Sequence, residues 1–259
     1  MSINEIRLIS FTVITLTAFA ILALERLFPY TKGQRILRSG FIDDFIFYNF
    51  LQTFILGIVI SYLIEFIDST SGISRFQLIS GWPVWLQVIF FLVTHDLYIY
   101  LFHKWQHKNK YLWRLHEAHH SPKEVDWLSG VRSHALEIFI NQTVEFLPII
   151  LLGSPPEVAV YKATISAVWG MYIHSNIDIY TGKLQYLING PEMHRWHHST
   201  GKGRNRNFAT KLAVWDWLFG TAYMPKDKPS EYGLKTYYPD NYFKQLVFAF
   251  RSFRKKERV

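Results

Sequence analysis

Long uncharged stretches along the first two thirds of the chain predict helices that enter a membrane. Residues 45–64 are twenty consecutive residues without a charge, enough to cross a hydrocarbon core of about 30 Å. Residues 9–24 form a shorter uncharged run of sixteen. We interpret it as a retained membrane helix rather than a signal peptide, because no small-residue cleavage site follows it. A third run, residues 82–102, is broken only by His95 and Asp96.

Two further apolar stretches, residues 138–152 and 158–173, flank the sequence Gly-Ser-Pro-Pro and predict a helical hairpin. Only Glu145 and Lys162 interrupt this hairpin with charge. Together these elements predict an all-α, multi-pass membrane protein. It has about four membrane helices or helical hairpins and a cytoplasmic helical cap.

The apolar and polar segments are interleaved, so we expect a single domain over residues 1–259. The membrane anchor is expected mainly in residues 8–102 and 136–174. The cytoplasmic region is expected in residues 103–135 and 175–259.

The basic residues predict how the chain crosses the membrane, because Lys and Arg concentrate in cytoplasmic loops. Four lie between the first and second apolar runs, one lies between the second and third, and fifteen of the 28 follow His174. One assignment satisfies these numbers. The N-terminus lies outside, everything from His103 to the C-terminus lies on the cytoplasmic side, and the hairpin dips into the membrane and returns.

Composition removes several kinds of site and partner. The chain contains no cysteine, which excludes disulfides, thiolate zinc sites and iron–sulfur clusters, so any metal needs nitrogen and oxygen ligands. The net charge of +8 fits either nucleic acid or anionic lipid. The membrane helices favour lipid, where each nearby Lys or Arg contributes about 1 kcal/mol. We therefore expect no nucleic-acid partner.

The most informative chemical pattern is His-x-x-His-His, which occurs twice, with a His-x-x-x-His pair just before the first copy. On a helix, positions i, i+3 and i+4 share one face, so each copy can aim imidazoles at one point. Neutral imidazole is the commonest metal ligand in proteins. Eight histidines in three such elements exceed the needs of one ion and indicate two. They are His103, His107, His116, His119, His120, His194, His197 and His198.

Four further residues are candidates for the same region. His174 ends the hairpin at the predicted cytoplasmic face, and we expect it to be a ninth ligand. His134 is predicted to be a tenth ligand or a group that supports one. Asp96, seven residues before His103, lies on the same helix face and is predicted to accept a hydrogen bond from a ligand imidazole. His95 is predicted to be structural, bonded to backbone at the membrane end.

Nine or ten imidazoles without an assigned carboxylate pair fit two ions with five ligands or fewer each. A catalytic zinc needs three protein ligands and a structural zinc needs four, so zinc alone explains the set poorly. We therefore expect two iron ions that use O₂ to break a C–H bond. No catalytic residue beyond the metal centre is predicted. Zinc can replace iron in a purified sample, because nitrogen-rich sites take up the wrong metal readily.

The segments around these histidines resemble the fatty acid hydroxylase/sterol desaturase superfamily of membrane di-iron enzymes over about residues 84–223. Three segments resemble the histidine boxes of that superfamily, in order, and residues 207–221 resemble the segment that usually follows the third box. The boxes read Asp96-Leu-Tyr-Ile-Tyr-Leu-Phe-His103-Lys-Trp-Gln-His107, Leu112-Trp-Arg-Leu-His116-Glu-Ala-His119-His120 and Gly190-Pro-Glu-Met-His194-Arg-Trp-His197-His198.

The resemblance implies O₂-dependent hydroxylation or desaturation of a lipid C–H bond at a cytoplasmic di-iron centre. It also implies a separate electron donor of the cytochrome b5, ferredoxin or reductase type. Sterols, fatty acyl chains, sphingoid bases and related lipids all fit as substrates. The chain is similar to the alkylglycerol monooxygenase branch as well. The Glu common in that branch after the second box histidine is Lys108 here, which argues against pterin-dependent ether cleavage.

An alternative from a different class is a membrane metal-binding or metal-transport protein. A transporter places its ligands near the middle of the bilayer, between broken helices. The histidines of this chain are expected at one membrane face, which favours the oxidoreductase.

Overall fold

Helices make up the regular structure of the chain. The computed structural model describes residues 1–252, so residues 253–259, the end of the predicted cytoplasmic region, lie outside the described residues. The described part contains two isolated β-bridges and no β-sheet. The all-α prediction is confirmed.

Three helical segments are long and apolar enough to cross a membrane, which confirms the multi-pass class. They are α1 (Ile3–Leu27), the continuous segment of π-helix η1 (Asp43–Gln52) and α2 (Thr53–Ser71), and α3 (Val84–Lys108). Large apolar side chains on their outer faces are exposed, among them Phe11 on α1 at 66% and Phe54 on α2 at 69%. Such surfaces suit contact with lipid rather than water.

The predicted hairpin is also present, as α5 (Ala135–Leu151) and α6 (Pro156–His174). Gly153 allows the tight turn between them, because its φ of +77° is left-handed and a Cβ there would lie 2.8 Å from the Cα of Gln77. α5 packs against α2 and α3, and α6 packs against α1 and α3. The hairpin is not among the three candidate spans, so the expected total of four membrane elements stays a prediction.

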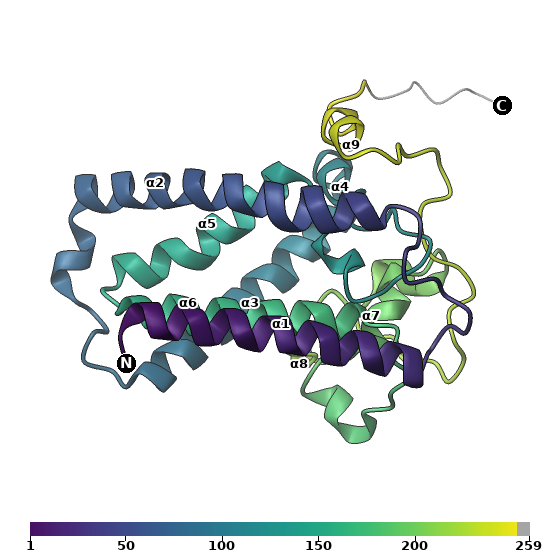
Figure 1. Ribbon diagram of the computed structural model, residues 1–259, viewed down its shortest axis with the longest axis horizontal. Helices are drawn as coiled ribbons and strands as arrows, with labels where there is room; N and C mark the ends of the chain where they lie inside the picture. Colours follow the sequence, from purple (N-terminus) through teal and green to yellow (C-terminus); the bar gives the residue numbers. More distant parts are fainter. Residues whose placement is uncertain (253–259) are drawn as a thin grey trace.

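Short helices gather at the end of the molecule opposite the N-terminus, where α4, α7 and α9 lie (Figure 1). The organisation of the whole chain as one domain stays a prediction. The short elements are the α-helices α4 (Lys110–His116), α7 (Pro191–His198), α8 (Val214–Leu218) and α9 (Tyr242–Phe248) and the 3₁₀-helices η3 (Ser129–Val131), η4 (Gly182–Tyr186) and η5 (Lys202–Asn205), whereas the 3₁₀-helix η2 (Ile73–Phe76) lies at the other end, beside the turn between α5 and α6.

The apolar core between the long helices is divided into small clusters. One joins the start of α3 to the turn of the hairpin through Val88, Phe91, Ile149 and Val158. Another, centred on Ile21, Met171 and Ile177, joins α1 to α6. The first cluster holds the starts of α3 and α6 together, and the second holds the end of α6, where His174 lies, against α1.

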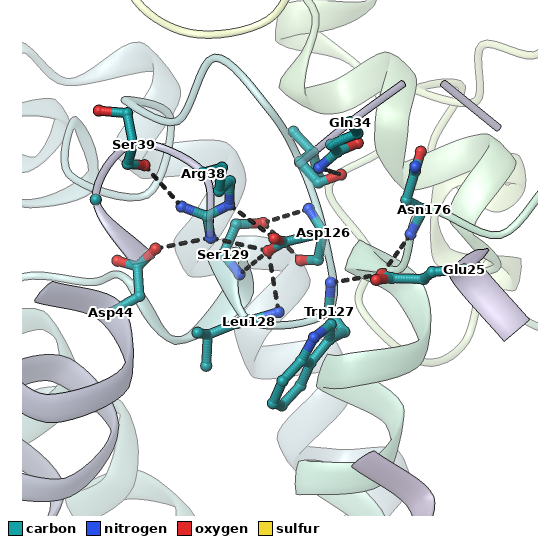
Figure 2. Close-up of polar contacts among 12 residues, drawn as sticks. Glu25, Gln34, Arg38, Ser39, Asp44, Asp126, Trp127, Leu128, Ser129 and Asn176 are labelled. Atoms are coloured by element: carbon teal, nitrogen blue, oxygen red, sulfur yellow. Dashed lines mark hydrogen bonds and ion pairs between the residues drawn. The ribbon is translucent and has the colours of Figure 1, made fainter. Parts of the chain in front are cut away.

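A buried polar network fastens the membrane helices to the loop between α4 and α5 (Figure 2). Arg38 donates from Nε and Nη2 to the two oxygens of Asp126 at 2.8 Å each, and its Nη2 also pairs with Asp44 at 2.8 Å. Glu25, at the end of α1, accepts from the backbone amides of Trp127 at 2.9 Å and Asn176 at 2.7 Å. Every carboxylate oxygen used here therefore fixes one segment to another.

Candidate metal centre

Four elements carry the nine candidate ligands to one end of the molecule (Figure 1). They are the last turns of α3, the end of α4 with the turn that follows it, the last residue of α6, and α7. Asn109 allows the sharp break between α3 and α4, because its side chain accepts from the amides of Tyr111 and Leu112 and caps the new helix. Pro191 begins α7 at the position where a missing N–H costs nothing.

The histidines form two groups, and within each group the ligand atoms all lie within 4.8 Å of one another. We call them the five-histidine group and the four-histidine group. The five-histidine group is His103, His107, His116, His120 and His197, and the four-histidine group is His119, His174, His194 and His198.

Each His-x-x-His-His sequence is divided between the two groups. In the first copy, His116 and His120 enter the five-histidine group and His119 enters the other. In the second copy, the i and i+4 positions enter the four-histidine group and His197 crosses to the five-histidine group. The groups are adjacent, since the rings of His120 and His198 are 4.7 Å apart. Two neighbouring ligand sets thus arise from one repeated spacing.

The spacing between facing ring nitrogens fits metal ligation. His103 Nε2 and His116 Nε2 are 2.9 Å apart, as are His174 Nε2 and His194 Nε2, and His194 Nε2 lies 3.1 Å from His198 Nε2. Metal–nitrogen bonds of about 2.0–2.1 Å place neighbouring ligand nitrogens about 3.0–3.4 Å apart. The five-histidine group and the four-histidine group therefore each fit one ion.

Three buried nitrogens in the five-histidine group have no hydrogen-bond partner among the described residues: Nε2 of His107, of His120 and of His197. A buried polar atom without a partner costs about 1–3 kcal/mol, so native proteins rarely leave several together. A bound cation would satisfy all three at once. This donor set of neutral imidazoles fits a transition metal ion.

The opposite ring nitrogens are held by acceptors, which sets the tautomer. In six of the nine histidines Nδ1 meets an oxygen, so Nδ1 carries the proton and the lone pair of Nε2 points into the group. The six contacts join His103 to Phe208 O (2.8 Å), His107 to Asn205 Oδ1 (3.2 Å), His116 to Glu137 Oε1 (2.8 Å), His119 to Arg132 O (3.2 Å), His174 to Gly170 O (2.8 Å) and His197 to Arg206 O (2.8 Å).

Burial also keeps these rings neutral. It lowers the pKa of His116 well below the ordinary value of 6.5, because the charged imidazolium would lose its hydration. The pKa values of His120 and His198 are lowered well below 6.5 by the same cause and, to a smaller extent, by neighbouring histidines. Neutral imidazole is the form that binds a metal, so the site is prepared for ligation at physiological pH.

Gly130 makes room for His174. A Cβ at position 130 would lie 2.5 Å from His174 Nδ1 and 2.8 Å from its Cγ. Any side chain there would displace the ring that ends α6. The 3₁₀ turn η3 thus shapes one wall of the four-histidine group.

Two predicted roles need correction. His134 lies outside both groups: its Nδ1 accepts from the amide of Leu136 and caps α5, and its Nε2 donates to Leu246 O at 3.0 Å. With both ring nitrogens bonded, it is not placed as a tenth ligand.

Asp96 does not accept from an imidazole either. It accepts instead from Thr210 Oγ1, the amides of Lys211 and Leu212, and Trp215 Nε1, at 2.8–3.1 Å. It anchors the loop before α8 rather than a ligand. Asp96 and His103 share a helix face, but each contacts a different part of the same loop, because Phe208 O meets His103 and residues 210–212 meet Asp96.

The residues missed by the sequence argument are those that hold Nδ1. Glu137 is the main one, since it accepts from both His116 and Gln106 (2.9 Å) through Oε1. A carboxylate at the first turn of an apolar helix was the available signal. The backbone acceptors, such as Phe208 O, have no signal in side-chain identity.

A cavity of about 250 Å³ begins beside the histidines and is lined by α3, α5 and α6. Its wall at the metal end includes His103, His116 and Glu137, and it extends between α3, α5 and α6 past Phe102 and Ile173. A lipid carbon in this cavity would lie beside the histidine groups.

His95 lies at the far end of the same cavity, in α3. Its Nδ1 is 3.3 Å from the ammonium of Lys162. The predicted bond to backbone is present as a contact with the backbone of Asn141 on α5, in addition to the contact with Lys162.

Comparison with known proteins gives a consistent result. The fatty acid hydroxylase family model matches residues 88–221, just over half of the 259-residue chain, and no solved structure matches. Ornithine lipid hydroxylase OlsE of Rhizobium tropici is 28% identical over 266 residues, which cover 99% of this chain and 80% of that protein.

Two other relatives match shorter stretches. Alkylglycerol monooxygenase of Homo sapiens is 29% identical over 160 residues, 60% of this chain and 34% of that protein. Methylsterol monooxygenase 1 of Rattus norvegicus is 28% identical over 131 residues, 50% of this chain and 44% of that protein. The chain thus spans less than half of either. The match to the family model, which contains all nine grouped histidines, shows that this chain belongs to the fatty acid hydroxylase family.

Proposed function

We propose that this protein is a membrane-embedded, O₂-dependent di-iron oxidoreductase that hydroxylates a C–H bond of a lipid. One observation carries the proposal: nine buried or half-buried imidazoles form two adjacent ligand sets at the mouth of a cavity between membrane helices. The relatives are named as lipid hydroxylases and monooxygenases, which supports the same chemistry.

The donor set favours iron over zinc as the working metal. A five-histidine group exceeds the three or four protein ligands that zinc uses, and every donor is nitrogen. When bound, two iron ions would supply the O₂ activation and hydrogen removal that an unactivated C–H bond requires. Zinc in a purified sample would still be compatible with this proposal, because such sites bind the wrong metal easily.

The residues of the chain would hold the metal ions, orient the imidazole ligands and enclose the lipid substrate. Glu137, Phe208 O and the other Nδ1 acceptors keep each imidazole in the metal-binding tautomer. The cavity places apolar side chains, among them Phe102 and Ile173, around the reacting carbon. Its position between α3, α5 and α6 gives a membrane lipid a short path to the site.

The substrate we favour is a polar membrane lipid, modified by hydroxylation. The relative that matches nearly the whole chain is an ornithine lipid hydroxylase. Ether cleavage is less well supported, since the chain covers only 34% of the human alkylglycerol monooxygenase and has Lys108 after His107. The metal centre is proposed to face the cytoplasm, where a separate electron donor reaches it.

The test combines metal analysis with lipid profiling. The protein is purified anaerobically in detergent, and cells with and without it are grown under ¹⁸O₂. We expect close to two iron ions per chain and a lipid that gains one labelled oxygen atom. His119→Ala and His197→Ala, one from each group, should lose metal and product together. Full metal content in both variants, or unchanged lipids with the wild-type chain, would refute the proposal. A metal carrier would bind metal and give no labelled lipid.

A further inference from the structure

A charged cluster lies at the inner end of the cavity, inside the membrane helices. Lys162 on α6 is fully buried and pairs with Glu145 on α5. The same carboxylate accepts from Ser166 at 3.2 Å, and the Lys162 ammonium also lies 3.3 Å from His95 Nδ1. Three helices therefore contribute ionisable or polar groups to one place in an otherwise apolar part of the protein.

The cluster has bonding capacity that its own members do not use. His95 contributes no free donor to the cavity, because its Nδ1 faces the Lys162 ammonium and its Nε2 is buried away from the cavity surface. Both hydrogen bonds to Glu145 use Oε1, so Oε2 accepts none from the described part of the chain. Lys211 lines the same wall, and no described group bonds to its ammonium.

These groups face the cavity that begins at the metal centre. His95, Glu145, Ser166 and Lys211 line it together with three of the candidate ligands of the four-histidine group. His95 is eight residues before His103 on α3, which places it about 12 Å deeper. At about 250 Å³ the cavity is smaller than most ligand pockets, which are roughly 300–1,000 Å³. It therefore suits part of a lipid rather than a whole one.

A purely structural ion pair would not need the unused groups. Charges inside a membrane protein are costly, and they usually mark a ligand or ion path. A buried pair that only joins helices gains from saturating every donor and acceptor. Here one carboxylate oxygen of Glu145 and the additional cation of Lys211 remain unused beside the cavity.

We propose that this inner end binds the zwitterionic head of the substrate lipid. Lys211 receives a carboxylate, and Glu145 Oε2 receives an ammonium. The carbon atoms adjoining the head then lie nearest the histidine groups. This inference rests on the proposed function, because it identifies the substrate class for that same site.

Binding without turnover tests the proposal. The full chain in detergent is titrated with Nα-octanoyl-lysine, which carries both charges. Its methyl ester lacks the anion, and Nα-octanoyl-norleucine lacks the cation. We expect the zwitterion to bind at least about tenfold more tightly than either, as charge-assisted hydrogen bonds in a buried site predict. Equal affinities for the three probes would overturn the proposal.

Variants locate the subsite. Lys211→Met should reduce the preference over the methyl ester to about threefold or less, and Glu145→Gln should do the same for the norleucine probe. Glu145→Gln/Lys162→Met removes the pair together and avoids an unpaired buried lysine. The matched control is Lys228→Met, a half-exposed lysine elsewhere that pairs with Asp178. Variants that keep the wild-type preferences would contradict the assignment.

The two proposals fail in different ways. Selective binding of the zwitterion by protein without iron or labelled product would refute the di-iron function and retain the subsite. Oxidation of a lipid by protein that does not distinguish the three probes would retain the function and refute the subsite.

Discussion

Single contacts on the outer side of the histidine rings decide which nitrogen can bind a metal. Glu137 is the charged example, since its Oε1 receives the Nδ1 proton of His116 and a bond from Gln106. Most of the other contacts are to backbone oxygens, which no side-chain substitution removes. Glu137 and Asn205, which contacts His107, are the two side chains at which this kind of support can be measured, and Glu137 is the carboxyl group of the two.

Replacing Glu137 should weaken metal binding without removing a ligand. Groups of this kind contribute about 10–100-fold to metal affinity. For Glu137→Gln we expect a loss of about tenfold, because the amide keeps an acceptor but loses the charge. Competition with a chelator measures the affinity, and Glu65→Gln, on the exposed face of α2, is the matched control. Wild-type affinity in Glu137→Gln would show that this contact does not support the site.

The buried imidazoles also predict how stability depends on pH. The pKa values of His119 and His198 are lowered from 6.5 in the folded protein, chiefly by burial. In the unfolded chain they take up protons near pH 6.5. Below that pH the unfolded state binds more protons, so stability falls as pH falls.

We therefore expect the melting temperature of the metal-free protein to decrease between about pH 7 and about pH 5. The variant His119→Gln/His198→Gln should show a shallower decrease, because two of the titrating groups are absent. A flat profile for the wild type would mean that these rings are not buried as neutral groups.

At the scale of the element, α5 is capped at its N-terminus by His134, which belongs to neither histidine group. His134 Nδ1 accepts from the amide of Leu136, as Ser or Asn does at other helix starts. Removal of such a cap costs about 0.5–2 kcal/mol.

His134→Ala should accordingly lower the free energy of unfolding by about 1 kcal/mol and leave metal content unchanged. His134→Asn should recover part of the loss, because asparagine caps well. The readouts are chemical unfolding in detergent and metal analysis, with His119→Ala as the variant that loses metal. Loss of metal from His134→Ala would restore the tenth-ligand interpretation.

The elements themselves could largely be predicted from the sequence. Uncharged runs located α1, α2, α3 and the hairpin because burial in lipid demands continuous apolar surface. The boundaries differ where charged turns continue a helix, as α1 does to Leu27, since backbone hydrogen bonds propagate past the apolar region. The short helices around the metal centre depend on tertiary contacts, which periodicity does not encode.

For the site, the repeated spacing identified eight of the nine grouped histidines and predicted two ions, and the position of His174 at the end of the hairpin identified the ninth. The spacing could not show that each copy divides between two groups, because this depends on how α4 and α7 face each other. The same limit explains Asp96. Its face on α3 followed from the period of the helix, whereas its partners lie in a loop more than a hundred residues later.

At the scale of the whole molecule, the network around Arg38 joins the membrane helices to the loop that carries the first His-x-x-His-His toward α5 (Figure 2). Arg38 pairs with Asp126 in that loop and with Asp44 in η1. Arg132 pairs with the same Asp44, and its carbonyl holds His119. A short chain of contacts thus runs from η1 to the four-histidine group.

Arg38→Met should destabilise the protein by about 3–5 kcal/mol, because it leaves the buried Asp126 carboxylate without its partner. Arg38→Met/Asp126→Asn should recover part of that loss, since the stranded charge is gone. Lys228→Met, which breaks a pair with both side chains 50% exposed, should cost at most about 1 kcal/mol. Unfolding in detergent gives the energies, and proteolysis between residues 28 and 42 reports release of the segment. If Arg38→Met were as mild as Lys228→Met, this network would not be what joins the membrane helices to the metal centre.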